Sequence, residues 1–456
     1  MERRAPLPWW FFVANWVLVI AALWLGVGIG ERMASPGGAV AALPRAELEA
    51  LAIVHRQIVA SHVDPQDPAE LLQRAIDGMV RSLDPYSRYV PPREVAQYEE
   101  RNSGAYVGIG ADFRTLGDEV VLMFPLAGGT AERAGLQPGD VLLAVDDVEL
   151  TTPALRERIA ERVRGERGTP VRLRLRRGDA TIDVALERAE VHRPCVAWAH
   201  RLPGEDGLGY LRLGDFQPDA ADEVLAATDG LRRDGALRGL VLDLRGNGGG
   251  SLDACVALAR AFVPDGLIVT QTRRDTEVVE RFEAKAEECR LPSLPLVLLV
   301  DEGSASASEV LAGALQDHGR AVIVGERTHG KGCVNTVYSW KDRPFQLKLT
   351  TGRYRTPNGR DIERRMRRDA DGGDETAAAA GSGGIAPDVP VALPAAARAA
   401  VLDALRAIEP PAAHRAAFAQ MARRRGLAVP DPPRVDDDSQ LAAAVATLRA
   451  RAAAAK

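Results

Sequence analysis

The chain has 456 residues, the length of about three ordinary domains, and a formal net charge of only −5. Because nucleic-acid binding needs a basic excess, we expect no nucleic-acid partner. The four cysteines are too few and too scattered for a disulfide scaffold, and none is spaced from a histidine as a metal ligand would be. We therefore expect a folded, multi-domain protein with no metal and no cofactor.

Residues 1–35 predict a signal anchor. Arg3 and Arg4 precede an apolar stretch over 9–30, about the length that crosses a hydrocarbon core of ~30 Å. Basic residues on this side predict a cytoplasmic N-terminus. We expect a single-pass helix in the inner (cytoplasmic) membrane, with the rest of the chain in the periplasm or another extracytoplasmic space. A cleaved signal peptide is the alternative, since small residues follow the stretch.

Residues 43–100 predict a helical region. Apolar side chains fall at helical spacing over 46–60 and again over 68–83, which indicates two amphipathic helices with a packing role. The segment 82–89, Ser-Leu-Asp-Pro-Tyr-Ser-Arg-Tyr, follows them.

Residues 104–190 contain two glycine-rich strings. The first, Tyr-Val-Gly-Ile-Gly-Ala over 106–111, has the pattern of a carboxylate-binding loop that leads into an edge strand. The second, Ala-Gly-Leu-Gln-Pro-Gly-Asp over 134–140, indicates a short helix and a turn before another strand. Loop N–H groups can hold a terminal carboxylate while an extended peptide adds to the strand edge. The residues that we expect to do this are Val107, Gly108, Ile109 and Gly110.

From 191 to 395, predicted strands alternate with predicted helices, which indicates an α/β core with a mainly parallel sheet. The apolar run 238–244 leads into Asn247-Gly248-Gly249-Gly250 and then a helix over 252–262. Such a loop can cradle an anion, as an oxyanion hole does, although a plain turn is the common alternative.

A serine-rich turn and a lysine between glycines carry the candidate chemistry. Ser304-Ala305-Ser306-Ala307-Ser308-Glu309 lies between the apolar run 296–300 and a predicted helix, and Gly330-Lys331-Gly332 follows later. A serine hydroxyl needs a base to take its proton, and an amine can be that base only when unprotonated. Each motif alone is more often a helix cap or a surface charge. Together with the glycine loop, the pair indicates nucleophilic catalysis.

These three segments resemble the catalytic domain of the C-terminal processing peptidases, or tail-specific proteases, which are serine proteases with a Ser-Lys dyad and an embedded PDZ domain. Matching segments run in the family's order from about 43 to 391 and include 313–317, 324–326 and 354–360. The resemblance implies that Ser306 is the nucleophile and Lys331 the general base. It also implies an oxyanion hole from the N–H of Ala307 and that of Gly249 or Gly250, and a PDZ domain over 104–190.

The chain departs from the family at two positions. The family usually has Gln four residues after the lysine, and this chain has Asn335, whose amide stands on a shorter stem. We expect Asn335 to orient Lys331. His329 stands where the family usually has Phe, which opens a Ser-His alternative. Because adjacent residues of an extended segment face opposite ways, we expect His329 to be exposed or to pack.

The C-terminal part is less informative. Residues 361–384 form a low-complexity insertion, which predicts a mobile surface loop. Residues 396–456 are rich in Ala and Arg and predict a helical tail that docks on the core or dimerises.

The sequence thus predicts a membrane-anchored, extracytoplasmic serine endopeptidase that cleaves protein or peptide substrates near their free C-termini through an acyl-enzyme. A catalytically inactive PDZ-bearing adaptor is one alternative, and a crotonase-like acyl-CoA enzyme is another. Whether a homo-oligomer or an activating partner is needed stays open.

Overall fold

The computed structural model describes residues 44–456 except 104, 274–276, 365–366, 369–373, 376–382, 407, 430–432 and 455–456. The predicted membrane anchor and most of the predicted low-complexity loop lie outside the described residues. Among those that are described, no helix is both long and apolar enough to span a membrane. The chain divides into two compact units, one ending at Ile76 and one beginning at Asp77.

The first unit contains α2 (Arg45–Ser61) and most of α3 (Pro68–Arg81), so both predicted N-terminal helices are confirmed. Asp67 caps α3, because its Oδ1 accepts the N–H groups of Ala69 and Glu70. The His55 ring bonds to the Pro68 carbonyl oxygen at 2.8 Å and ties the two helices together.

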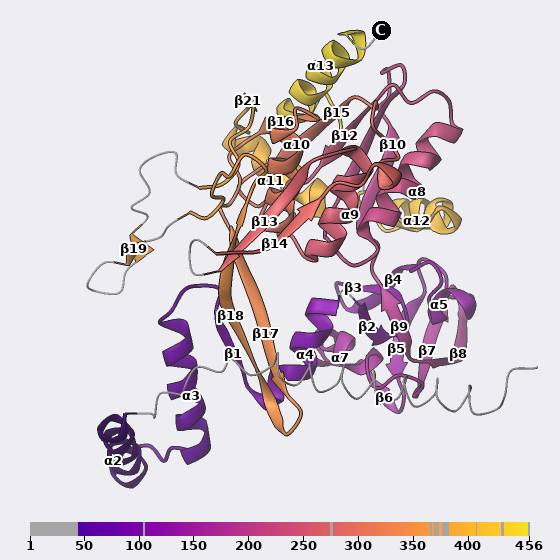
Figure 1. The fold of residues 1–456 in the computed structure, drawn as a ribbon. Helices are drawn as coiled ribbons and strands as arrows, with labels where there is room; N and C mark the ends of the chain where they lie inside the picture. The colour runs from indigo at the N-terminus through magenta and orange to yellow at the C-terminus, as the bar shows by residue number, and fades with distance from the viewer. Residues whose placement is uncertain are drawn as a thin grey trace, which may run out of the picture. The chain divides into compact units, whose positions relative to one another are not determined.

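The second unit opens with β1 (Arg88–Val90) and α4 (Pro92–Ser103). β1 pairs with β18 (Arg343–Arg355) in a sheet of order β1-β18-β13-β14, where β13 is Leu267–Arg273 and β14 is Glu277–Glu283. β17 (Cys333–Trp340) pairs antiparallel with β18, and the two form the long ribbon seen in Figure 1.

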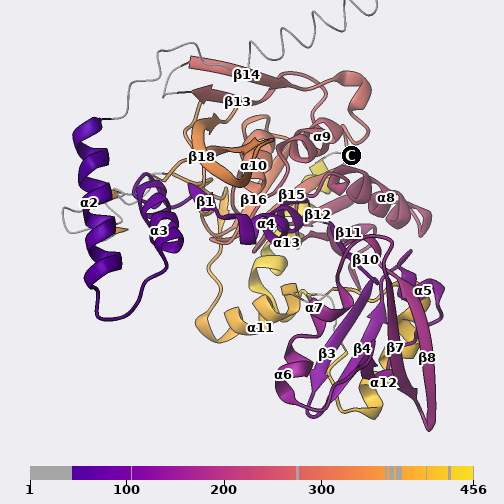
Figure 2. The same ribbon diagram turned by 90° about the horizontal axis from the view of Figure 1, so that it is seen from below.

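A β-rich domain follows, as predicted. Its antiparallel sheet has the order β3-β4-β5-β7-β8, so β3 (Ala111–Leu116) is an edge strand (Figure 2). Ile109, Leu122 and Leu173 form part of its apolar core. Its other elements are β2 (Ala105–Gly108), β4 (Glu119–Pro125), α5 (Thr130–Arg133), β5 (Val141–Val145), β6 (Val148–Glu149), α6 (Pro153–Glu157), α7 (Ile159–Val163), β7 (Pro170–Arg177), β8 (Ala180–Glu187) and β9 (Ala189–His192).

The core sheet is mainly parallel, as predicted. Its order is β10-β11-β12-β15-β16-β21, and only the β10–β11 pair is antiparallel. The strands are β10 (Val196–Arg201), β11 (Leu208–Leu213), β12 (Gly239–Asp243), β15 (Leu296–Val300), β16 (Ala321–Gly325) and β21 (Val389–Pro390).

Helices cover both faces of this sheet, which explains why its central strands read as continuous apolar runs. Leu296 and Leu298 of β15 pack on one face with α8 (Ala220–Arg233), α9 (Leu252–Phe262) and α10 (Ala307–Asp317). The alternate residues Val297 and Leu299 pack on the other face against α13 (Ser439–Ala454).

The predicted helical tail is present and is part of the second unit. It comprises α11 (Ala395–Arg406), α12 (Arg415–Arg424) and α13. α13 covers the core sheet, whereas Phe418 and Met421 of α12 pack on the β-rich domain against Phe124. The shorter elements are η1 (Ala286–Glu288), β19 (Arg367–Arg368), β20 (Asp374–Glu375) and η2 (Ala412–His414).

Candidate active site

The candidate site lies at the carboxyl ends of the parallel strands β12, β15 and β16. Loops after the strands of such a sheet meet at one edge, where ligands usually bind. A cavity of about 770 Å³ opens there, and its lining includes the predicted residues Ser306, Lys331, Asn335, Gly249 and Gly250. The fold therefore brings together three loops that are far apart in the sequence.

Ser306 has an unusual backbone, with φ 56° and ψ −115°. It is one of two non-glycine residues with positive φ in the described part of the chain; the other is Asp146. This conformation costs an L-residue about 1–3 kcal/mol, so the surrounding contacts must hold it. The turn presents Ser306 to the cavity, directly before α10.

Hydrogen bonds distinguish the three serines of the turn. The Ser304 Oγ donates to the Leu244 carbonyl at 2.8 Å, and the Ser308 Oγ donates to the Asn247 carbonyl at 2.9 Å. Both side chains are fully buried and join the turn to the glycine loop. Of the three, Ser306 is the one that lines the cavity.

The glycine loop (247–250) touches the serine-rich turn 304–309, which we call the nucleophile turn, at Gly249. A Cβ at Gly249, where φ is 99°, would lie 2.8 Å from the Ser306 Cβ and 2.9 Å from the Ala307 nitrogen. The Gly249 N–H already donates to the Asn247 side-chain oxygen at 2.9 Å. This favours Gly250 over Gly249 as the second oxyanion donor, beside Ala307.

The buried carboxylate of Glu309 joins the nucleophile turn to the segment 330–332, which contains Lys331 and which we call the base loop. It accepts the N–H groups of Ser306 (2.9 Å), Gly330 (2.6 Å) and Lys331 (2.8 Å), and the Thr328 hydroxyl (2.6 Å). Burial raises the pKa of Glu309, and these donors partly offset the effect. Sequence reasoning gave Glu309 no role, although Ser-x-x-Glu before a helix is a capping-box pattern.

Lys331 projects toward the segment that follows α3. Its Nζ lies 5.3 Å from the centre of the Tyr86 ring, a cation–π distance. Lys348 of β18 lines the same cavity, and burial, followed by the charge of Lys331, lowers the pKa of Lys348. The base loop is thus enclosed by residues that sequence reasoning did not connect with it.

Asn335 lines the cavity, but its Nδ2 donates to the Thr350 hydroxyl at 3.0 Å. Thr350 in turn donates to the Asp84 carboxylate at 3.1 Å, and Asp84 also accepts the Ser87 hydroxyl. The segment 82–89 is thereby fixed against the ribbon β17–β18. That Asn335 orients Lys331 stays a prediction.

His329 is exposed, and it is absent from the residues that line the cavity. Its N–H donates to the Ser304 carbonyl at 3.0 Å, so its backbone helps to hold the turn. The geometry therefore favours Lys331 over His329 as the partner of Ser306.

The predicted carboxylate-binding residues lie together where β2 leads into β3. Val107 and Gly108 belong to β2, which pairs with β9, and Ile109 and Gly110 connect it to the edge strand. The Ile109 carbonyl is used inside the domain, where it accepts the Ala131 N–H. Capture of a carboxylate by this turn stays a prediction.

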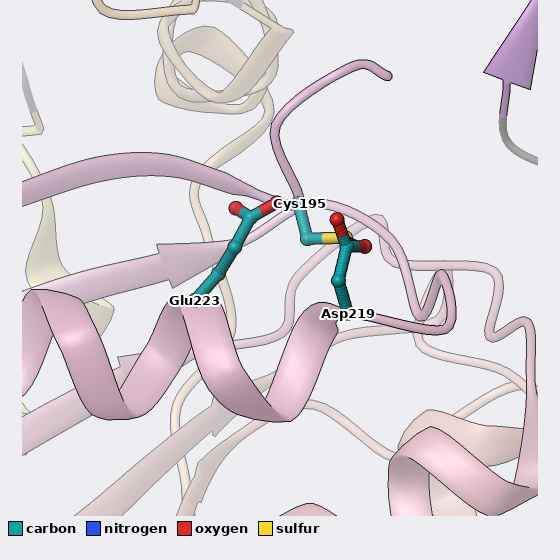
Figure 3. A group of neighbouring side chains, drawn as sticks. All are labelled: Cys195, Asp219 and Glu223. Carbon is teal, nitrogen blue, oxygen red and sulfur yellow. Dashed lines mark hydrogen bonds between the residues drawn. The ribbon is translucent and has the colours of Figure 1, made fainter.

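One group of potential metal ligands lies elsewhere in the described residues. Cys195, Asp219 and Glu223 have ligand atoms within 4.8 Å of one another, and the two carboxylates point from the start of α8 toward the thiol (Figure 3). The thiol donates to Asp219, and Glu223 accepts the Val196 N–H. Burial raises the pKa of Cys195, which disfavours the thiolate that binds metals. These groups therefore form an internal hydrogen-bonded cluster.

Comparisons with known proteins agree with this geometry. The chain matches the family model of peptidase family S41 over 207–391 and that of a PDZ domain over 125–177. It is 34% identical over 321 residues to a CtpA-like serine protease of Staphylococcus haemolyticus, with coverage of 70% of this chain and 63% of the relative. It is 36% identical over 318 residues to the corresponding Staphylococcus aureus (strain MSSA476) protein, covering 69% and 62%. The chain thus spans somewhat less than two thirds of these relatives' length.

Among solved structures, the photosystem II D1 C-terminal processing protease is 30% identical, with a TM-score of 0.41 and coverage of 76% of this chain and 94% of that one. The S41 match contains the glycine loop, the serine turn and the base loop, and the PDZ match lies within the β-rich domain. The chain belongs to peptidase family S41 and carries a PDZ domain.

Proposed function

We propose that the protein is a serine endopeptidase in which Ser306 attacks the scissile carbonyl and Lys331 is the general base. One observation carries this proposal: a strained serine and a lysine face one cavity, and the buried Glu309 holds the backbone of both. Strain at a non-glycine residue persists where surrounding contacts enforce it, and such residues cluster at active sites.

The reaction follows from the arrangement. Lys331 Nζ takes the Ser306 proton as Oγ bonds to the carbonyl carbon, and the carbonyl oxygen gains negative charge. The N–H groups of Ala307 and Gly250 stabilise this oxyanion. The ammonium then returns the proton to the leaving amine, an acyl-enzyme forms, and water hydrolyses it by the same steps.

A serine-reactive fluorophosphonate tests this function directly. We expect it to label the wild type and to leave Ser306→Ala unlabelled. Ser293→Ala is the control, because it removes an exposed serine outside the cavity lining and should keep the label. A folded wild type that never reacts would instead favour the inactive adaptor that binds C-termini.

The PDZ domain supplies the preference for chain ends in this proposal. An extended substrate adds to the free edge of β3, and the turn over 107–110 holds its terminal carboxylate. The similarity to a protease named for C-terminal processing supports this reading. A peptide with a free C-terminus should have a higher kcat/KM than the same peptide with an amidated C-terminus, because amidation removes the carboxylate. Equal kcat/KM values would contradict the proposed preference for chain ends.

Membrane anchoring through the apolar stretch 9–30 completes the proposal and places the catalytic unit outside the cytoplasm. Its support is the length of the stretch and the basic residues before it. When cells that express the full chain are fractionated, the protein should be in the membrane fraction. Deletion of residues 1–35 should move it to the soluble fraction. Equal distributions would contradict the anchor.

A further inference from the structure

Among the described residues, the acidic side chains of Asp84, Glu309 and Glu363 interact with the base loop or with Cys333 directly after it. Each oxygen of Glu309 accepts two hydrogen bonds. Oε1 accepts the Thr328 hydroxyl and the Gly330 N–H, and Oε2 accepts the N–H groups of Ser306 and Lys331. Asp84 is occupied too, by two backbone N–H groups on Oδ1 and hydroxyls on both oxygens. Every oxygen of these two carboxylates therefore already accepts at least one hydrogen bond from the protein.

Glu363 differs from the other two. Its Oε2 is buried and has no hydrogen-bond partner within the described part of the chain. A buried acceptor without a donor is costly, so such an atom in a native structure calls for an explanation.

Glu363 lies against the base loop. The Arg364 N–H donates to the Gly330 carbonyl at 2.8 Å, and a Cβ at Gly332 would lie 2.4 Å from the Glu363 nitrogen. The segment 362–364 therefore runs directly alongside the base loop 330–332, whose middle residue is Lys331. Glu363 also interacts with Tyr86, the ring over which the Lys331 amine lies.

The catalytic step creates a positively charged hydrogen-bond donor, and Glu363 Oε2 has no donor among the residues that the structure describes. When Ser306 attacks, its O–H bond breaks, Oγ bonds to the carbonyl carbon, and Lys331 becomes an ammonium with an additional N–H. We propose that Glu363 is a positioning residue whose Oε2 accepts a hydrogen bond from the Lys331 ammonium and stabilises it. This inference rests on the proposed roles of Ser306 and Lys331.

The ionisation of Glu363 makes the proposal testable. Burial raises the pKa of Glu363 to about 7, and the Gly332 N–H and the charge of Arg353 partly oppose this. Other ionisable groups that face it are Asp361, Glu309, Tyr86 and Cys333. Because the pKa of this acid is raised, its charged form accumulates only as pH rises through about 7. The ammonium would then gain its partner over the same pH range.

The experiment compares pH profiles of kcat for the wild type, Glu363→Gln and the control Asp342→Asn. Asp342 is an exposed acid at the tip of the ribbon β17–β18. We expect wild type and control to share a rise through pH 7 that Glu363→Gln lacks. Above pH 8, Glu363→Gln should be about tenfold slower or more, as for the loss of a hydrogen bond to a charged group. KM should change little.

Fluorophosphonate labelling separates this inference from the function beneath it. If the wild type and Glu363→Gln both label, the dyad holds and the pH profile decides the role of Glu363. A Gln variant that keeps the rise near pH 7 would overturn the inference while leaving the dyad intact. An unlabelled wild type would overturn both. Glu363→Asp, which keeps the charge, should recover part of the pH-dependent rise.

Discussion

The nucleophile turn and the base loop of this site are built in different ways. Ser306 is held by its own neighbourhood, since Glu309, which lies three residues later in the first turn of α10, accepts its N–H. Lys331 is held by distant segments: Glu309 bonds its N–H, Tyr86 lies under its amine, and Arg364 bonds the carbonyl beside it. The difference shows that one half of the site is local in sequence, whereas the other half exists only after folding.

The largest expected effect tests whether the two halves act as one unit. Ser306→Ala and Lys331→Ala should each lower kcat/KM by about 10⁴-fold or more. Because members of one catalytic unit are not additive, the double variant should be no slower than either single variant. Peptide hydrolysis measures this. Substantial turnover by Lys331→Ala would show that Ser306 does not depend on Lys331, and it would favour His329 as the general base.

The contact between the glycine loop and the nucleophile turn gives the next effect. Gly249→Ala places a methyl group against Ser306, Ala307 and the Ala305 carbonyl, at a positive φ that Ala disfavours. We expect kcat to fall by about 10²–10³-fold, as when an oxyanion donor is lost. Gly248→Ala is the matched control, because its Cβ would meet nothing within 4 Å. Equal activity of the two variants would mean that the loop does not shape the site.

Glu309→Gln tests the link between the two halves. The amide can accept on one oxygen only, so its NH₂ would oppose backbone N–H groups that now reach a carboxylate. We expect a loss of about 1–3 kcal/mol in the free energy of unfolding. A kcat about 10²-fold lower should accompany it, since small displacements of catalytic groups are costly. Denaturant unfolding and peptide kinetics measure the two, with the exposed Glu302→Gln as control. Normal stability would show that the carboxylate is replaceable.

The smallest effect concerns the distant support of the base loop. Burial acts to raise the pKa of Asp84, but hydrogen bonds from Ser87, Tyr86 and Thr350 outweigh it and leave the pKa lowered. Stability from the ionised Asp84 is therefore present above the unfolded pKa of about 4 and is lost as pH falls through the folded value. Because the side chain is partly exposed, Asp84→Asn should cost less than about 1 kcal/mol at pH 7.

Chemical unfolding at pH 7 and pH 3 checks the sign of this effect. The difference between the wild type and Asp84→Asn should shrink toward pH 3. A difference that is constant with pH would assign the cost to packing and not to charge.

Sequence by itself determined the local half of this protein. Apolar runs with helices between them specified a mainly parallel sheet, because a strand buried on both faces needs apolar residues at every position. Ser306 was identified because a strand, a serine-rich turn and a helix are consecutive in the chain. The helices α2 and α3, which end at Ser61 and Arg81, were likewise predicted from the spacing of their apolar residues.

Tertiary structure decided the rest, because long-range contacts leave no periodic trace in a sequence. It showed which serines are buried donors, that the Asn335 amide bonds Thr350, and that Glu309 and Glu363 flank Lys331. The C-terminal tail is a second case. Arg245, which lies just before the glycine loop, is fully buried. Asp438 of the tail forms an ion pair with it, with 2.8 Å between the Asp438 Oδ2 and a guanidinium nitrogen. A buried charge needs partners. Asp243, two residues before Arg245, is a local one at 2.6 Å, whereas Asp438 reaches Arg245 only because the chain folds.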